Sequence, residues 1–77
     1  MDQYIGEVRW FAFDAVPEAW APCDGKALPI MEHQALFSLI GTKFGGDGRT
    51  TFALPKVAAN AGVNAWIALE GVYPQRR

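Results

Sequence analysis

Prolines and glycines divide this chain into short segments, and that division limits its fold more than any other feature. Five prolines and eight glycines are spread over 77 residues. Proline removes a backbone donor and glycine readily adopts positive φ, so both end regular elements. The segment 32–40 is the one good helix candidate, because Leu36, Leu39 and Ile40 form an apolar stripe at helical spacing. Gly41 follows it where a C-terminal capping glycine belongs.

Residues 4–13 predict the first strand. Val8 and Trp10 share one of its faces. Glu7 and Arg9 share the other face, and towards the end of the segment both faces become apolar. A strand that is apolar on both faces is usually central in its sheet or covered by a neighbouring subunit. We expect one of these two positions for the segment 4–13.

Four further segments read as short extended stretches. Pro22 limits one of them to the edge or the end of a sheet, because it cannot donate to a ladder. Asp24-Gly25 is a strong turn signal, and Pro17 centres another turn at 14–18. The extended segments are 20–23, 27–30, 52–54 and 63–69.

These elements predict a small α+β fold, with a twisted antiparallel sheet of short strands and one short helix packed on it. The length of 77 residues argues for a single domain, 1–77. Apolar residues make up 51% of the chain and aromatic residues 13%, which favours a chain that also buries a surface between subunits. We expect five aromatic residues in the core or in subunit contacts, namely Trp10, Trp20, Phe37, Phe52 and Trp66.

Charge and apolar patterning argue against several classes of function. The formal net charge is −1, and the only basic cluster is Arg76–Arg77, so we expect no nucleic-acid binding. No apolar run approaches the roughly 20 residues of a membrane span, so we expect no membrane insertion. Cys23 is the only cysteine, which excludes an intrachain disulfide. Residues 1–4 lack the basic start and apolar stretch of a signal peptide.

The glycine-rich segment 45–50 invites comparison with a nucleotide-binding loop. A P-loop requires Gly-x-x-x-x-Gly-Lys-Ser/Thr after a buried strand, so that amides and a lysine surround the phosphates. Here the predicted preceding element is a helix, the lysine is missing, and Asp47 would repel phosphate. We therefore interpret the segment as a structural loop.

Cys23 with His33 and Asp24 is the one candidate set for nucleophilic catalysis. A single Cys and a single His are a weak signal, and a small core cysteine beside a turn is the better interpretation. The same two residues give too few ligands for zinc within one chain, although a threefold axis could gather three copies of His33. Asp47 with nearby carbonyls could touch calcium, but the loop lacks a set of carboxylates. We expect no catalytic site, no metal and no cofactor.

Several stretches together resemble the phage tail collar domain family. Each motif is weak by itself, but their order and spacing agree with the family pattern. Residues 20–25 resemble its Gly-Trp-x-x-Cys-Asp-Gly signature, and 35–42 resemble its helix, which ends in Gly-Thr. Residues 44–55, FGGDGRTTFALP, resemble its most recognisable loop. The segments 1–13 and 66–74 are similar to the opening and the closing strand of microcystin-dependent-protein-type tail proteins.

The resemblance implies a non-catalytic structural or assembly module of a phage tail fibre or tail-like particle. It implies a homotrimer, with other tail or baseplate proteins as neighbours, located in the virion tail and made in the bacterial cytoplasm without a signal peptide. An alternative is a receptor- or glycan-binding adhesion module that uses the loop 44–51. The proposed inter-subunit or exposed loop residues are Phe44, Gly45, Gly46, Asp47, Gly48 and Arg49.

The departures from the family pattern lie mainly after residue 55. On the resemblance, 1–55 is the collar motif region, 56–62 a short connector and 63–77 the closing strand and tail. Family members usually carry Asp after Leu-Pro and then a long, variable, glycine-rich region, whereas this chain has Lys56 and a few small residues. Met31 stands where a capping Ser is common. The chain therefore resembles a minimal form without the variable receptor-binding region.

Overall fold

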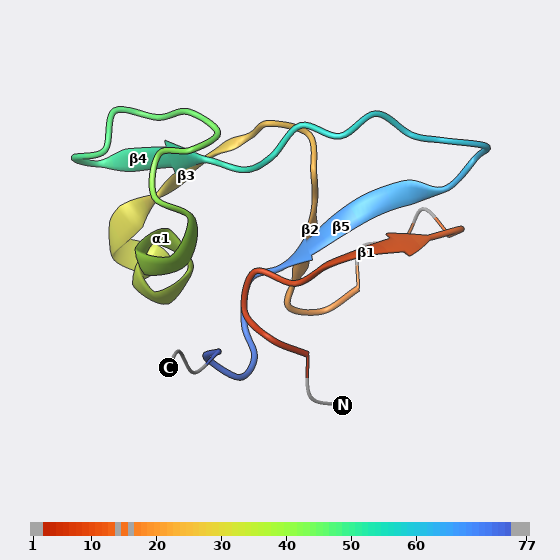
Figure 1. The fold of residues 1–77 in the computed structure, drawn as a ribbon, viewed down its shortest axis with the longest axis horizontal. Helices are drawn as coiled ribbons and strands as arrows, with labels where there is room; N and C mark the ends of the chain where they lie inside the picture. Colours follow the sequence, from red (N-terminus) through yellow and green to blue (C-terminus); the bar gives the residue numbers. More distant parts are fainter. Residues whose placement is uncertain (1–2, 14, 16, 75–77) are drawn as a thin grey trace.

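A computed structural model of the chain describes residues 3–13, 15 and 17–74, and in them the strands form two antiparallel sheets (Figure 1). The three-stranded sheet has the order β1-β5-β2, and the two-stranded sheet pairs β3 with β4. The bounds are Val8–Phe11 for β1, Trp20–Pro22 for β2, Ala27–Pro29 for β3, Thr51–Ala53 for β4 and Asn64–Ala68 for β5. The predicted turn at 14–18 and the pair Arg76–Arg77 lie partly or wholly outside the described residues.

The helix forms close to its predicted place. α1 spans Gln34–Ile40, and a 3-10 turn, η1, spans Ile30–Glu32 just before it. The prediction began the helix at residue 32, but His33 has φ −139° and interrupts the regular winding. Gly41 adopts φ 56° and donates its N–H to the Phe37 carbonyl at 2.7 Å, as expected of a capping glycine. Among the described helices, none is long and apolar enough to cross a membrane.

One hydrophobic core joins the helix to both sheets. Leu36 of α1, Phe52 of β4 and Ile67 of β5 are each at most 1% exposed and belong to one cluster. Burying a side chain of this size stabilises the fold by about 1.5–3 kcal/mol. The same cluster contains Cys23, Leu28, Leu54 and Ala65. The seven-residue helix thus persists because its inner face is packed, since so short a helix is marginal alone.

β5 rather than β1 is the central strand of the three-stranded sheet. Ala65 and Ile67 face the main core, whereas Trp66 and Ala68 belong to a second cluster with Trp20. These four of the five β5 residues are buried, which is the pattern of a strand covered on both faces. Of the two positions expected for the segment 4–13, the central one was wrong, because its strand lies at an edge of the sheet. Cover by a neighbouring subunit stays a prediction.

The first strand is also shorter than predicted. Gly6 has φ 85°, and Glu7 donates its N–H to the Tyr4 carbonyl at 3.0 Å, so the chain turns before β1 begins. Tyr4 instead forms a parallel bridge with Val72. The two ends of the described chain are thereby held side by side.

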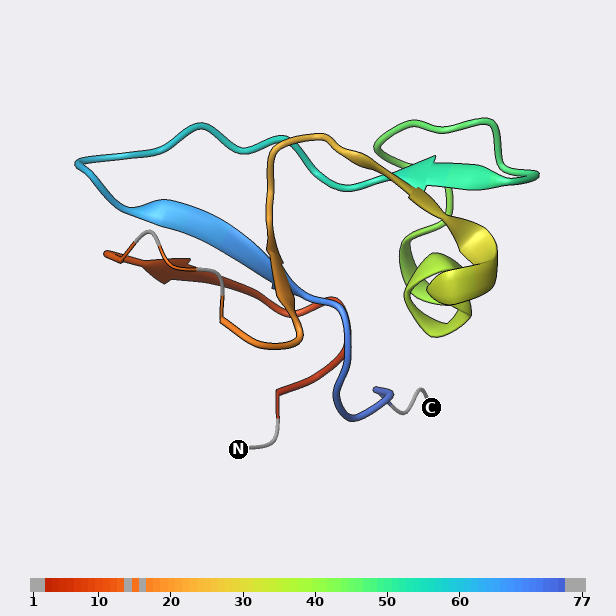
Figure 2. The ribbon, with the colours of Figure 1, turned by 180° about the vertical axis from the view of Figure 1, so that it is seen from behind.

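The α+β class with antiparallel sheets of short strands and a short helix is confirmed, and the strands divide between two sheets. The division occurs at the predicted turn, where Gly25 has φ 82° and the Lys26 N–H bonds Oδ1 of Asp24 at 3.0 Å. This turn directs the chain from β2 in one sheet to β3 in the other. Seen from behind, α1 and the β3–β4 pair lie at one end, and the three-stranded sheet lies towards the other (Figure 2).

The connector 56–62 ends in a tight hairpin. Asn60 and Val63 exchange two backbone hydrogen bonds of 2.9 Å. Between them Ala61 has φ 55° and Gly62 has φ 79°, as in the type I′ turn that suits the twist of paired strands. Alanine at the first of these positions is strained, because the left-handed region costs a residue with a Cβ about 1–2 kcal/mol.

Candidate functional site

The glycine-rich loop is organised around the carboxylate of Asp47. Its Oδ1 accepts the three backbone N–H groups of Arg49, Thr50 and Thr51 at 2.8, 2.9 and 3.0 Å, and its Oδ2 accepts the Thr50 hydroxyl at 3.0 Å. These bonds, that from the Thr51 N–H foremost, hold the pKa of Asp47 well below its usual value. The carboxylate is therefore engaged in shaping the loop.

The glycines of this loop let its backbone lie directly on β4. A Cβ on Gly46 would stand 2.3 Å from the Phe52 Cα, closer than any side chain can fit. Gly45 accepts the N–H of Ala53 at 3.1 Å, and Gly48 donates to the Thr51 carbonyl at 3.0 Å. The loop thus occupies the backbone groups on the outer side of β4. Its glycine content has a structural cause.

Two side chains of the loop point towards solvent rather than into the fold. Phe44 is 43% exposed, with the Lys43 Nζ 5.8 Å from its ring centroid. The Arg49 side chain is exposed, although its backbone N–H bonds Asp47. The loop therefore presents an aromatic ring and a guanidinium on a backbone held by hydrogen bonds. Their role between subunits or towards a ligand stays a prediction.

Four of the five chosen aromatic residues pack inside the chain. Phe52 is fully buried, Trp66 and Trp20 are 4% and 9% exposed, and Phe37 is half-buried with its ring 5.5 Å from that of Phe52. Phe11, which sequence reasoning did not select, packs edge-on against Trp20 at 5.4 Å. Trp10 differs from the others, because it is 48% exposed.

Trp10 and Val8 form an exposed apolar pair on the face of the sheet that carries the main core. Val8 pairs with Ile67 and Trp10 with Ala65, and directly opposed residues of an antiparallel pair point to the same face. Ile67 and Ala65 are 1% and 4% exposed, whereas Val8 is 45% exposed. The cover over this face ends before β1. Only the alternation of Val8 and Trp10 in the sequence pointed to this surface.

The surroundings of Cys23 do not activate its thiol. Cys23 is 3% exposed within the main core, and burial, with a smaller effect of the Asp24 charge, raises the pKa of its thiol. The His33 ring lies edge-on to Phe52 with centroids 6.5 Å apart. A buried, protonated thiol is a poor nucleophile. Within residues 3–13, 15 and 17–74, no three His, Cys, Asp or Glu side chains gather into a metal site.

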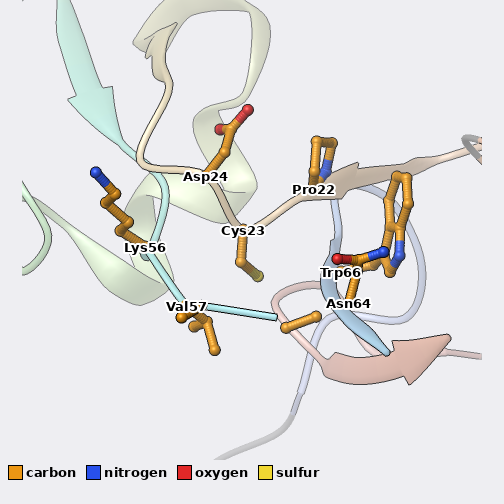
Figure 3. Close-up of a pocket in the computed structure, with 9 residues that line it drawn as sticks. Pro22, Cys23, Asp24, Lys56, Val57, Asn64 and Trp66 are labelled. Atoms are coloured by element: carbon orange, nitrogen blue, oxygen red, sulfur yellow. The ribbon is translucent and has the colours of Figure 1, made fainter. Parts of the chain in front are cut away.

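An open pocket of about 620 Å³ lies between the connector and the strands β2 and β5 (Figure 3). Asp24 and Lys56 lie on one side of it and Trp66 on the other. The Nε1 of Trp66 is buried without a hydrogen-bond partner in the described structure. The rest of the lining is mostly apolar, and comes from Pro22, Cys23, Val57, Ala58, Asn64 and Ala65. The pocket could hold an apolar side chain, but it presents no activated nucleophile.

The chain matches the model of a known family over more than half of its length. The family model described as the Phage Tail Collar Domain matches residues 6–61, which span β1 to the hairpin of the connector. No curated protein matches the chain. The matched region ends before β5, so the strand that completes the three-stranded sheet lies outside it.

Proposed function

Because the chain belongs to the phage tail collar domain family, we propose that it is a non-catalytic structural module of a phage tail fibre or tail-like particle. It acts by assembling with copies of itself and with other tail or baseplate proteins. The buried Cys23 thiol, with its raised pKa, supports a role without catalysis. Location in the particle tail follows from the family.

The observation that carries this proposal is the exposed pair Val8 and Trp10. Large apolar side chains side by side on a strand are costly to leave in water, and such patches mark interaction surfaces. Trp10 and Val8 are 48% and 45% exposed on a face that elsewhere forms the core. Tryptophan is also enriched among the residues that dominate protein interfaces.

Three copies is the stoichiometry that the resemblance implies. A closed ring of three joins one surface of each copy to a different surface of the next. The loop residues Phe44 to Arg49 are proposed to contribute the second surface, since the loop is ordered by Asp47 and exposes Phe44. Both surfaces lie on described residues, so amino-acid substitutions can test each of them.

Light scattering after size exclusion tests the assembly. The expected mass is three times 8.4 kDa, or a multiple of that trimer. Trp10→Ser is expected to lower the mass, because it removes an apolar contact between copies. Met31→Ser is the matched control, since Met31 is 84% exposed and lies on η1. A single-chain mass for the unchanged protein at every concentration would overturn the assembly role.

Receptor or glycan binding through the loop is the second candidate function. The exposure of Phe44 and Arg49 on a well-held backbone favours it, because aromatic rings and guanidinium groups suit sugar faces and carboxylates. Binding to intact bacterial cells should then fall in a Phe44→Ala, Arg49→Ala double variant whose mass is unchanged. Burial of both side chains in the assembled protein would count against it.

A further inference from the structure

The outer side of β1 presents backbone groups that have no hydrogen-bond partner among residues 3–13, 15 and 17–74. Ala68 donates its N–H to the Glu7 carbonyl at 2.9 Å, which sets the alternation of this antiparallel ladder. The backbone groups of Arg9 and Phe11 therefore face β5, whereas those of Val8 and Trp10 face away from it. In the part of the chain that the structure describes, β1 pairs with β5 alone.

The other three sheet edges are each blunted. On β2, Pro22 lacks an N–H and the Trp20 N–H bonds the Pro17 carbonyl at 3.2 Å. β3 ends in Pro29, which also lacks a donor. On β4 the outer groups bond the glycine-rich loop. Prolines and covering loops are among the ways in which proteins prevent strand addition. Among the described residues, β1 is the sheet edge that has neither.

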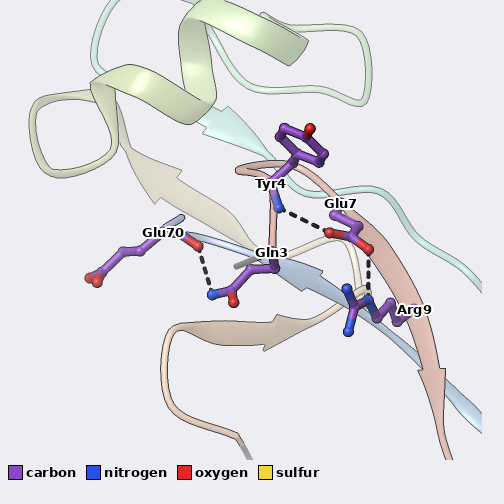
Figure 4. Close-up of polar contacts among 5 residues, drawn as sticks. All are labelled: Gln3, Tyr4, Glu7, Arg9 and Glu70. Atoms are coloured by element: carbon purple, nitrogen blue, oxygen red, sulfur yellow. Dashed lines mark hydrogen bonds and ion pairs between the residues drawn. The ribbon is translucent and has the colours of Figure 1, made fainter. Parts of the chain in front are cut away.

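The side chains of β1 and of Glu7, just before it, suit pairing with an identical strand. On one face Glu7 receives the Arg9 Nε at 2.6 Å and the Tyr4 N–H at 2.9 Å (Figure 4). These bonds, that from Arg9 foremost, lower the pKa of Glu7. The other face carries Val8 and Trp10. One edge thus combines open backbone groups, apolar side chains and a pair of opposite charges two residues apart.

Charge selects one register among the possible pairings of two β1 strands. An antiparallel pair centred on Arg9 would place Arg9 opposite Arg9, which is unfavourable. A pair centred on Trp10 would place Arg9 opposite Phe11. A pair centred on Val8 places Glu7 opposite Arg9 twice, and joins the outward backbone groups of the two Val8 residues.

We propose that β1 forms an antiparallel strand pair with β1 of a second copy, about a twofold axis through Val8. Trp10 then lies opposite Gly6 of the second copy, which has no side chain of its own. The inference rests on the proposed function only in that both require self-association. A twofold contact gives dimers by itself, or joins two trimers into an assembly of six copies.

Proline at position 8 tests the backbone pairing. Val8→Pro removes an outward N–H without breaking the bonds to β5. It keeps an apolar side chain at position 8 and leaves Trp10 in place, so the proposed trimer contact is retained, and the mass is expected to halve, from six copies to three or from two to one. Ala27→Pro is the matched control, because the Ala27 N–H also faces away from its partner strand. If the unchanged protein has a mass of one or three copies, and Val8→Pro has the same mass, the pairing is overturned. If that mass is three copies, the proposed trimer still stands.

Exchange of charges tests the register independently of proline. Glu7→Lys should weaken self-association at least about tenfold, because it opposes two like charges at each end of the pair. The double variant Glu7→Arg, Arg9→Glu should associate with itself but not with the unchanged protein when the two are mixed with different fluorescent labels. Free mixing of the two proteins into one assembly, with no loss in Glu7→Lys, overturns the proposal.

Discussion

Two regions of this small chain differ in how completely their backbone groups are hydrogen-bonded within the chain. Around β4 the glycine-rich loop occupies the outer backbone groups, and Asp47 accepts four hydrogen bonds within the loop. Around β1 the outer backbone groups have no partner among residues 3–13, 15 and 17–74, and Val8 and Trp10 are nearly half exposed. The outer groups of β4 are thus bonded within the chain, whereas those of β1 are available, among the described residues, for a contact with another chain.

The difference shows that a conspicuous motif can serve the fold itself. The loop 44–51 has the glycines and the acidic residue that suggest a binding site, yet the geometry uses most of them internally. The strand Val8–Phe11 carries no unusual motif, yet its outer backbone groups are the ones without a partner in the part of the chain that the structure describes. The position of β1 in the sheet, rather than its residue types, leaves its backbone groups available for pairing.

The largest expected effect is the disruption of the region around β4 in Gly46→Ala. The added Cβ would lie 2.3 Å from the Phe52 Cα, so β4 must move away from the core. We expect a loss of about 3 kcal/mol or more in the free energy of unfolding, measured by urea denaturation. Gly62→Ala is the control: φ is similar but nothing lies within 4 Å of the added Cβ, so the loss should be about 1 kcal/mol. Equal losses in the two variants would contradict the close packing of the loop.

Proline substitution should separate the two sides of β1. Arg9→Pro removes a bond to β5 and is expected to cost about 3 kcal/mol of unfolding free energy. Val8→Pro changes a residue whose N–H faces away from β5, so it should cost only about 1 kcal/mol of unfolding free energy in the single chain. Denaturation at a concentration where the protein is one chain checks this. A larger loss in Val8→Pro than in Arg9→Pro would mean that the alternation along β1 is the reverse of that described.

Asp47→Asn should weaken the region around β4 by less than Gly46→Ala and change its response to acid. The folded pKa of Asp47 lies below its unfolded value, so its contribution to stability is complete above that value, about 4, and is lost as the pH falls towards the folded pKa. The variant should lack that part of the acid sensitivity in thermal melts between neutral pH and pH 2. Asp24→Asn is the control, since within the described residues Asp24 accepts one backbone bond, from Lys26. Identical pH profiles for Asp47→Asn and the unchanged protein would contradict the role of the carboxylate.

The smallest expected effect is a gain in stability at the hairpin of the connector. Ala61→Asn places Asn-Gly at the two positive-φ positions of the type I′ turn, where that pair is preferred. We expect about 0.5–1 kcal/mol more unfolding free energy, because asparagine tolerates the left-handed region better than alanine. Ala59→Asn on the same connector should bring no gain. A loss of stability in Ala61→Asn would show that the turn differs from type I′.

Much of the local structure follows from the glycines, prolines and turn residues of the sequence. Gly41 ends the helix, Asp24-Gly25 turns the chain, and Pro22 places its strand at an edge, each through a backbone property of one residue type. These effects are local, so a single sequence reveals them. The α+β class followed from the same reasoning.

The pairing of strands could not be predicted in the same way. The segments 4–13 and 63–69 are both apolar on two faces, so either could be the central strand. Only the three-dimensional register decides that β5 is central and that β1 is at the edge. The close contact of Gly46 with Phe52 is likewise invisible in the sequence, because it depends on how the loop folds back on β4.

Amide hydrogen exchange in β1, followed residue by residue by NMR over a range of concentrations, tests the central claim most directly. The Arg9 N–H should be protected at every concentration, because it faces β5. The Val8 N–H should exchange rapidly in the single chain and become at least about tenfold slower as the copies associate. Rapid exchange of Val8 in the fully associated protein would contradict the account, and would place the contact between copies elsewhere.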